Sequence, residues 1–297
     1  MKTIKAKQLV STTNAYGWFG ARYNLNLYRG CNFGCIYCDS RSDVYQVKNF
    51  DEVCVKENIS GLLEKELKSK QKTGIISMGA MSDPYNPFEK KEKATRRALE
   101  LINQYKFGVN ITTKSDLILR DIDLLKKINQ HSEVIISLTI TTADDRLRAL
   151  IEPKSVSTKR RFETLKILSD EGLYTGITLM PLIPFLNDSL ENVLDIVERG
   201  FKAGIQFIYA GFGVTQRAGQ MEYMYNKFDE YFPGLKNKFI KEFKHNYSCG
   251  TRNNLYEPYK TRCKELEIRY KMEDIIQGAK KNIKEQQVSL FWNILSI

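Results

Sequence analysis

Three cysteines stand within eight residues of one another in the stretch YRGCNFGCIYCDS, which begins at Tyr28. The C-x3-C-x2-C spacing puts Cys31, Cys35 and Cys38 on one short loop, where three thiolates can converge on a soft metal centre. Three protein ligands leave one position of a four-coordinate site unfilled. In a cubane iron–sulfur cluster, that position is an iron free to bind a substrate or a cofactor, an arrangement that suits catalysis.

A structural zinc site is the competing interpretation of this loop, and it needs a fourth ligand, usually from a second closely spaced pair. The other cysteines, Cys54, Cys249 and Cys263, form no such pair, and neither His131 nor His245 is near the loop in sequence. These three cysteines could ligate an auxiliary cluster or be ordinary half-buried thiols. The loop therefore favours an iron–sulfur centre, with a non-catalytic, cysteine-ligated nucleic-acid-binding module as the alternative.

Composition and charge indicate where such a protein works. Hydrophobic residues make up 42% and charged residues 27% of the chain, as in ordinary soluble proteins. No apolar run reaches the roughly 18 residues that span a membrane, and the N-terminal stretch has no apolar signal segment. We therefore expect a cytoplasmic protein without a membrane partner, where thiols stay reduced. The net charge of +11 is compatible with a nucleic-acid partner, although a lysine-rich proteome would produce the same balance.

The elements that must position the loop follow a repeating pattern. Apolar segments typical of buried strands alternate with amphipathic segments typical of helices, which predicts parallel strands joined by helical crossovers. The expected strands are 23–30, 74–79, 108–114, 133–140, 174–182 and 205–212, and the expected helices are 59–70, 88–105, 119–130, 157–172 and 189–204. Six such units form either an open doubly wound sheet or a partial barrel, and periodicity does not separate the two.

The pattern changes near residue 220, where segments rich in Lys, Tyr and Phe begin and no further clear strand follows. We therefore divide the chain into a core of residues 1–220 and a helical C-terminal extension of residues 221–297.

A C-x3-C-x2-C motif directly after the first strand of a six-fold β/α pattern resembles the radical S-adenosylmethionine (SAM) enzymes. The resemblance implies an α/β fold, a partial (β/α)6 TIM barrel with its site at the carboxyl ends of the strands. It also implies a [4Fe–4S] cluster on Cys31, Cys35 and Cys38, whose fourth iron chelates the amino and carboxylate groups of SAM. An electron from a donor such as flavodoxin or ferredoxin then cleaves SAM to a 5′-deoxyadenosyl radical. Tyr37, the aromatic residue before the third cysteine, is expected near the adenine.

Polar residues at three strand ends match the SAM cradle that the resemblance implies. Ser82 and Asp83 follow the second strand, where oxygen acceptors would bind the methionine amino group. Lys114 ends the third strand and would pair with the methionine carboxylate. On the fourth strand, Ser137 and Thr139 share one face, and either could reach the ribose or the carboxylate.

Each of these assignments has a structural alternative. Ser82 and Asp83 could form a turn or a helix N-cap before Pro84. Lys114 could be a solvated strand end, and Ser137 could be a buried hydroxyl whose hydrogen bonds are satisfied within the protein.

The combination of NLYRGC, SDP, TTKS and the later IEP resembles the spore photoproduct lyase family and its DNA repair photolyase-like relatives. This resemblance implies a lyase-like reaction on DNA, with radical modification of RNA, protein or a small metabolite as the alternative. In the lyase reaction a cysteine returns a hydrogen atom to the lesion, from a position two residues before the serine of the second-strand motif. This sequence has Ala80 there, so we expect little or no spore-photoproduct repair.

The pentapeptide QVSLF near the C-terminal end resembles the peptide by which bacterial replication and repair proteins dock on the DNA sliding clamp. Such a peptide binds in extended form, with Gln287 as a polar anchor and Leu290 and Phe291 filling a hydrophobic pocket. The alternative is an apolar segment that packs on the barrel.

Overall fold

The protein is described by a computed structural model that covers residues 1–13, 17–244 and 246–280. The clamp-docking prediction for Gln287, Leu290 and Phe291 therefore lies outside the described residues. Within the described ranges, no helix is long and apolar enough to cross a membrane.

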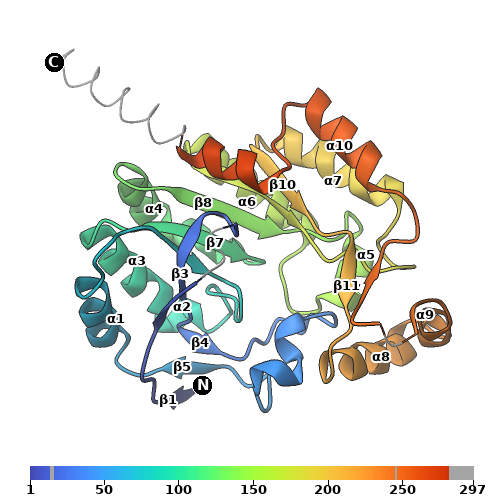
Figure 1. The fold of residues 1–297 in the computed structure, drawn as a ribbon, viewed down its shortest axis with the longest axis horizontal. Coiled ribbons are helices and arrows are strands. Elements are labelled where there is room, and N and C mark those ends of the chain that lie inside the picture. Colours follow the sequence, from blue (N-terminus) through green and yellow to red (C-terminus); the bar gives the residue numbers. More distant parts are fainter. Residues whose placement is uncertain (14–16, 245, 281–297) are drawn as a thin grey trace.

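A seven-stranded sheet organises the described part of the chain, in the order β10-β9-β8-β7-β6-β3-β2 (Figure 1). Every neighbouring pair is parallel except β2 and β3, which are antiparallel. The parallel strands are β3 (Ala21–Leu25), β6 (Ile75–Met78), β7 (Gly108–Thr113), β8 (Val134–Thr139), β9 (Tyr174–Leu179) and β10 (Phe207–Ala210), with β2 (Val10–Thr12) at the edge. Each of the six predicted strands overlaps one of them.

The strand order resolves the ambiguity that periodicity left. From β3 to β10 each strand lies beside its predecessor in the chain, and the order never reverses as it does in a doubly wound sheet. Right-handed crossovers without a reversal put all the helices on one face of the sheet, which curls it into a partial barrel. The crossover helices are α1 (Ile59–Lys68), α3 (Ala94–Gln104), α4 (Ile122–Asn129), α6 (Thr158–Asp170) and α7 (Leu190–Lys202).

The first turns of two predicted helices differ from the regular α-helix that we expected. The helix predicted at 88–105 is divided into α2 (Glu89–Glu92) and α3, because Lys93 adopts a left-handed conformation with φ of 51°. The buried carboxylate of Glu89 accepts a hydrogen bond from the Thr95 amide, which ties the break to the first turn of α3. The helix predicted at 119–130 starts with a 3-10 segment, η3 (Asp116–Asp121), and α5 (Asp145–Ile151) was not predicted.

Successive side chains along each strand point to opposite faces of the sheet, and both faces are buried. The outward positions, such as Val109, Ile136 and Ile177, are fully buried in the core that also contains the inner faces of the crossover helices. The inward positions near the amino ends of the strands are also apolar. Ile135, Tyr174 and Phe207 pack there in a separate cluster that fills the barrel floor. Each buried side chain of this size contributes about 1.5–3 kcal/mol, so both faces stabilise the sheet.

The N-terminal region carries the cysteine loop on a small sheet of its own. Within the described residues this sheet has the order β1-β5-β4 and consists of β1 (Lys2–Ile4), β4 (Tyr28–Arg29) and β5 (Cys54–Lys56). The loop leaves β4 and continues through two 3-10 turns, η1 (Asp39–Arg41) and η2 (Asp43–Tyr45), before it returns to β5.

The C-terminal extension is mainly helical, with α8 (Gln220–Tyr231), α9 (Leu235–Phe243), α10 (Tyr256–Glu265) and a further helix at 272–280. The prediction of no further strand was wrong, because β12 (Ser248–Gly250) pairs antiparallel with β11 (Gly213–Thr215). Three small residues give no periodic signal, so only the pairing identifies this strand. The boundary at residue 220 stays a prediction, and β11 and β12 pair across it. Figure 1 shows α8 beside the blue cysteine-loop segment, with α9 packed on α8 farther from the loop.

Candidate functional site

A cavity of about 640 Å³ lies at the carboxyl ends of the parallel strands. Its walls come from the cysteine loop, from the ends of β6 to β9 and from the β11–β12 pair. The lining residues with chemical functions include the three loop cysteines, Asp39, Ser77, Ser82, Asp83, Thr112, Lys114, Thr139, Thr178, Thr215, Ser248 and Cys249. The inward-facing side chains are apolar at the barrel floor and polar at these strand ends. The polarity of the barrel interior therefore increases toward this cavity.

Cys31, Cys35 and Cys38 all line the cavity, and all three are free thiols. The turn into the loop depends on Gly30, whose φ is +77° and whose hypothetical Cβ would lie 2.6 Å from the Phe50 carbonyl oxygen. The Cys31 amide donates to that same carbonyl at 2.9 Å. The RGC portion of the motif therefore sets the direction in which the first thiol enters the cavity.

The donor set suits a soft metal centre, although the thiols do not yet meet at one point. Among the described residues, no group of three or more Cys, His, Asp and Glu side chains has the spacing of a formed metal site. Burial raises the pKa of Cys31 to about 12 and raises that of Cys35 as well, so these thiols hold their protons without a cation. Iron would displace those protons and draw the three sulfurs together.

Ser82 and Asp83 line the cavity, and they also stabilise the turn before Pro84 that was the structural alternative for these two residues. The Asp83 carboxylate accepts hydrogen bonds from the Tyr85 amide at 2.8 Å, the Thr113 hydroxyl at 2.7 Å and the Lys114 amide at 2.9 Å. Burial raises the pKa of Asp83, and these hydrogen bonds offset part of that shift. The Ser82 hydroxyl donates to the Gly30 carbonyl, which connects the end of β6 to the cysteine loop.

Lys114 is half-buried in the same cavity, and its ammonium lies 5.7 Å from the centre of the Tyr37 ring. Burial lowers the pKa of Lys114, but the nearby carboxylates of Glu152 and Asp83 raise it, and the net pKa lies above the ordinary value. The structure therefore brings a charged ammonium, the Tyr37 ring and the loop thiols to one wall of the cavity.

Tyr37 is held by a buried ion pair that sequence reasoning missed. Its hydroxyl donates to Glu152, and Glu152 is paired with Arg161. Both partners are fully buried, and Arg161 also donates to the Thr139 carbonyl at 2.7 Å. Glu152 belongs to the IEP triplet noted in the sequence, but nothing in the sequence indicated that Arg161 is its partner.

Ser137 is not among the cavity-lining residues. It is fully buried and lies 3.0 Å from the Thr112 hydroxyl, as expected for the structural alternative. Thr112 and Thr139, unlike Ser137, line the cavity. A direct contact between Ser137 and a ligand stays a prediction.

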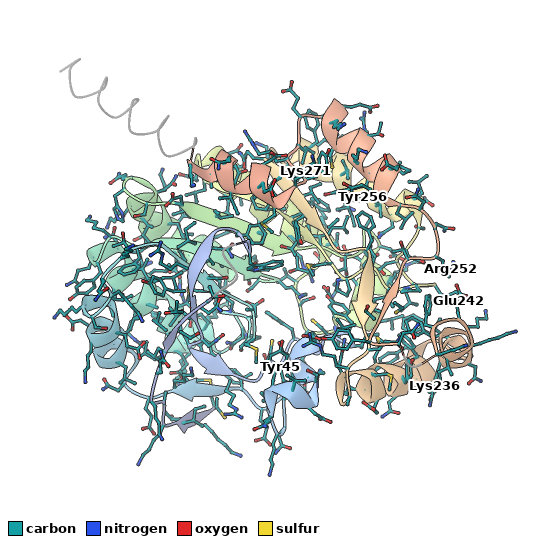
Figure 2. All side chains as sticks on the ribbon, viewed as in Figure 1. Tyr45, Lys236, Glu242, Arg252, Tyr256 and Lys271 are labelled. Atoms are coloured by element: carbon teal, nitrogen blue, oxygen red, sulfur yellow. The ribbon has the colours of Figure 1, made fainter. Side chains whose placement is uncertain are left out.

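The C-terminal wall holds the cysteine loop from the opposite side, another feature that the sequence did not indicate. Asp39, the residue after Cys38, accepts hydrogen bonds from the Thr215 hydroxyl at 2.9 Å and from Arg217 at 3.0 Å. Arg217 also donates to the hydroxyl of Tyr45, which Figure 2 labels on the blue loop segment. The Gln220 amide donates to the Tyr37 carbonyl at 2.9 Å. We call these four contacts the loop clasp.

The three cysteines outside the loop lie in different places. Cys249 lines the cavity, Cys263 is fully buried on α10, and Cys54 is on β5. Within the described residues these three cysteines lie on three separate elements, and an auxiliary metal site built from them stays untested.

Comparison with known proteins connects this cavity to a large family. The model of the Radical SAM superfamily matches residues 25–198, a span that includes the cysteine loop and the ends of β6 to β9. An uncharacterised protein of Methanocaldococcus jannaschii is 38% identical over 189 residues, which is 62% of this chain and 68% of that protein. An uncharacterised protein of Mycobacterium tuberculosis is 26% identical over 190 residues, and there the match spans about half of the relative, 56%.

Among solved structures, spore photoproduct lyase complexed with dinucleoside spore photoproduct superposes with a TM-score of 0.67 and 12% identity. That superposition covers 91% of this chain and 81% of the lyase. A lyase variant with bound AdoMet and dinucleoside spore photoproduct gives the same TM-score at 13% identity, over 91% and 80% of the two chains. At this identity the likeness is one of fold, and it confirms the predicted barrel type with its helical C-terminal region.

Proposed function

The chain belongs to the radical SAM superfamily, and on this premise we propose that it is an enzyme that cleaves S-adenosylmethionine reductively and acts on DNA. The observation that carries this proposal is the shared cavity. Three free thiols, the Lys114 ammonium and the Asp83 carboxylate all line it, at the carboxyl ends of parallel strands. A bare structural zinc loop would have no need for the other two groups.

In this proposal Cys31, Cys35 and Cys38 hold a [4Fe–4S] cluster. The cluster would supply one electron, received from a donor of the flavodoxin or ferredoxin class, to split SAM into methionine and a 5′-deoxyadenosyl radical. Lys114 pairs with the methionine carboxylate, and a charge-assisted contact of this kind is worth about 1.5–3 kcal/mol.

The remaining cradle residues orient the cofactor. Ser82 and Asp83 accept from the methionine amino group, and the Tyr37 ring lies along the adenine. Ser137 acts near the ribose through Thr112, whose hydroxyl lies 3.0 Å from its own. The buried Glu152–Arg161 pair keeps the Tyr37 ring in place, which limits how far the adenine can move.

The charge distribution supports a nucleic-acid substrate and also limits which part of it reacts. The chain carries a net charge of +11, whereas among the described residues the Asp, Glu, Lys and Arg side chains that line the cavity are Asp39, Asp83 and Lys114. Two carboxylates beside one ammonium disfavour a phosphate inside the cavity. We therefore expect the phosphate backbone to stay on the basic surface while a neutral base or sugar enters. A cytoplasmic location and docking on a sliding clamp through Gln287, Leu290 and Phe291 belong to the same proposal and rest on the sequence.

Anaerobic SAM cleavage by the reconstituted protein tests the proposal. We expect 5′-deoxyadenosine to form faster with single-stranded or duplex DNA than with RNA of the same sequence or with no nucleic acid. Dinucleoside spore photoproduct should yield little thymine, because Ala80 has no thiol at the position from which the lyase returns a hydrogen atom. Equal stimulation by RNA would move the substrate class to RNA, and one bound zinc without iron would leave only the non-catalytic binding module.

A further inference from the structure

The cavity has a side that the proposed SAM cradle does not use, at the gap between the two ends of the row of parallel strands. Within the described residues, β3 and β10 stand at opposite ends of this row and do not pair with each other. The turn that leads into β3 closes the gap. Trp18 packs there against Tyr209 of β10, and Phe19 packs against Phe207. We call these four aromatic residues the barrel seam.

Trp18 is the member of the barrel seam that lines the cavity. Its indole is half-buried, whereas Phe19 and Phe207 are fully buried. The ring centre of Trp18 lies 5.1 Å from that of Phe19 and 5.4 Å from that of Tyr209, and both contacts are edge-to-face. Such contacts between aromatic rings are favourable and directional. They therefore fix the plane of the indole while part of its surface stays open to the cavity.

The cavity wall next to the barrel seam is uncharged. It consists of Met180 and Pro181, which follow β9, and of Gly211 and Phe212, which follow β10. The two strand ends lie close together, since a Cβ on Gly211 would be 3.0 Å from the Cβ of Met180. The charged residues of the cavity come instead from the cysteine loop and from the ends of β6 and β7. A neutral, flat group is therefore the chemistry that suits this side.

We propose that the Trp18 indole is the surface on which one nucleobase of the substrate stacks, an inference that rests on the proposed function and locates the base within the cavity. Every base has a flat π-face, and stacking on an aromatic side chain needs no charge on either partner. Trp18 stands at the gap between β3 and β10, whereas Asp83 and Lys114 follow β6 and β7 within the row. The base and the cofactor thus have separate places in one cavity.

The binding of two DNA strands tests the role of Trp18. One strand is a short fluorescein-labelled oligothymidylate, and the other has the same length and backbone but an abasic site at every position. Fluorescence anisotropy gives both dissociation constants for the reconstituted protein with S-adenosylhomocysteine present. Trp18→Leu should bind the oligothymidylate about 5- to 150-fold more weakly than wild type does. The abasic strand should bind both proteins alike, because it has no base to stack.

Two further variants separate stacking from support of the fold. Trp18→Phe keeps an aromatic ring and should bind the oligothymidylate more tightly than Trp18→Leu does. The control Phe201→Leu removes an exposed ring of α7 that does not line the cavity, and it should bind both strands as wild type does. Iron content and affinity for S-adenosylhomocysteine should stay at the wild-type values throughout. Equal weakening of the two strands in Trp18→Leu, or an equal loss of affinity for S-adenosylhomocysteine, would contradict a base-stacking role.

Photocrosslinking locates the base without any variant. An oligonucleotide with 5-iodouracil in place of thymine is irradiated in complex with the wild-type protein, and the base forms a bond to an aromatic ring that stacks against it. Peptide mass spectrometry should find this bond at Trp18. Crosslinks confined to other residues would show that the base lies elsewhere.

The outcomes separate this inference from the function on which it rests. If wild type binds neither strand and DNA does not stimulate formation of 5′-deoxyadenosine, DNA is not the substrate, and the proposed function and this inference are both wrong. If DNA stimulates SAM cleavage by wild type but Trp18→Leu keeps the wild-type preference for the oligothymidylate over the abasic strand, the proposed function stands and this inference alone is wrong.

Discussion

The two walls of the cavity differ in how far apart in the sequence their residues lie. The cysteine-loop wall takes its thiols from residues 31–38, one contiguous stretch, and the ends of β6 and β7 add the charged groups Asp83 and Lys114. The facing wall joins β11 at Gly213–Thr215 to β12 at Ser248–Gly250, segments that are far apart in the chain. The first wall has the charged groups to which the proposed function assigns cofactor binding, whereas the second has small side chains and one thiol. This difference shows that the charged groups of this cavity come from the cysteine loop and the strand ends.

The two walls are also mechanically connected. The loop clasp links Asp39 to Thr215 and Arg217, and Tyr37 to Gln220, across the cavity mouth. The cysteine loop is therefore anchored both by the barrel and by the C-terminal extension.

The largest expected effect comes from removing the defining groups of the first wall. Replacing Cys31, Cys35 and Cys38 together by Ala should abolish iron binding and SAM cleavage, because the remaining thiols lie on three separate elements, β5, β12 and α10. Iron and sulfide analysis after anaerobic reconstitution measures this, with Cys54→Ala as the matched control. A triple variant with wild-type iron content would mean that the loop is not the cluster site.

A smaller but still large effect is expected from the buried ion pair behind Tyr37. Arg161→Met leaves Glu152 buried without its partner, which should lower the free energy of unfolding by about 3–5 kcal/mol. The neighbouring Arg160 pairs with Asp116 at a partly exposed site, so Arg160→Met should cost less than about 1 kcal/mol. Urea denaturation of both variants gives the comparison, and equal losses would contradict a special role for the buried pair.

Lys114→Ala should weaken ligand binding more than it disturbs the fold. Loss of one charge-assisted contact, about 1.5–3 kcal/mol, lowers the affinity by about tenfold or more. Calorimetric titration of the reconstituted protein with S-adenosylhomocysteine measures this, and the exposed Lys126→Ala serves as the control. An unchanged dissociation constant would show that the carboxylate of the cofactor binds elsewhere.

The smallest effect on stability is expected at the loop clasp. Arg217→Ala removes a partly exposed ion pair with Asp39, which should cost only about 0.2–1 kcal/mol of unfolding free energy. Its consequence should instead appear as slower reconstitution of the cluster, because the loop is held from one side only. If iron incorporates at the wild-type rate, the two walls act independently and the clasp is simply a surface contact.

Much of the first wall could be predicted from the sequence, because its determinants are local. The spacing of Cys31, Cys35 and Cys38 lies within one loop, and the alternation of apolar strands and amphipathic helices is repeated along the chain. Lys114 and Asp83 could be predicted for the cavity because the carboxyl ends of parallel strands meet at one edge of the sheet. Where local reasoning was incomplete, as at the break before α3, the buried carboxylate of Glu89 is contacted by Tyr28 and Arg120, two residues distant in the sequence.

The second wall was decided by tertiary structure alone. The three-residue strand Ser248–Gly250 has no period of its own, and it forms because Gly213 lets the two backbones approach. The same holds for Arg161 with Glu152 and for Arg217 with Asp39, since a charge in a sequence does not specify its partner. The sequence thus determined which thiols and charged groups the cysteine loop and the strand ends bring to the cavity, because those groups are set by spacing and strand position. Only the folded chain determined that Cys249 faces them, because that contact depends on pairing between segments that no local pattern connects.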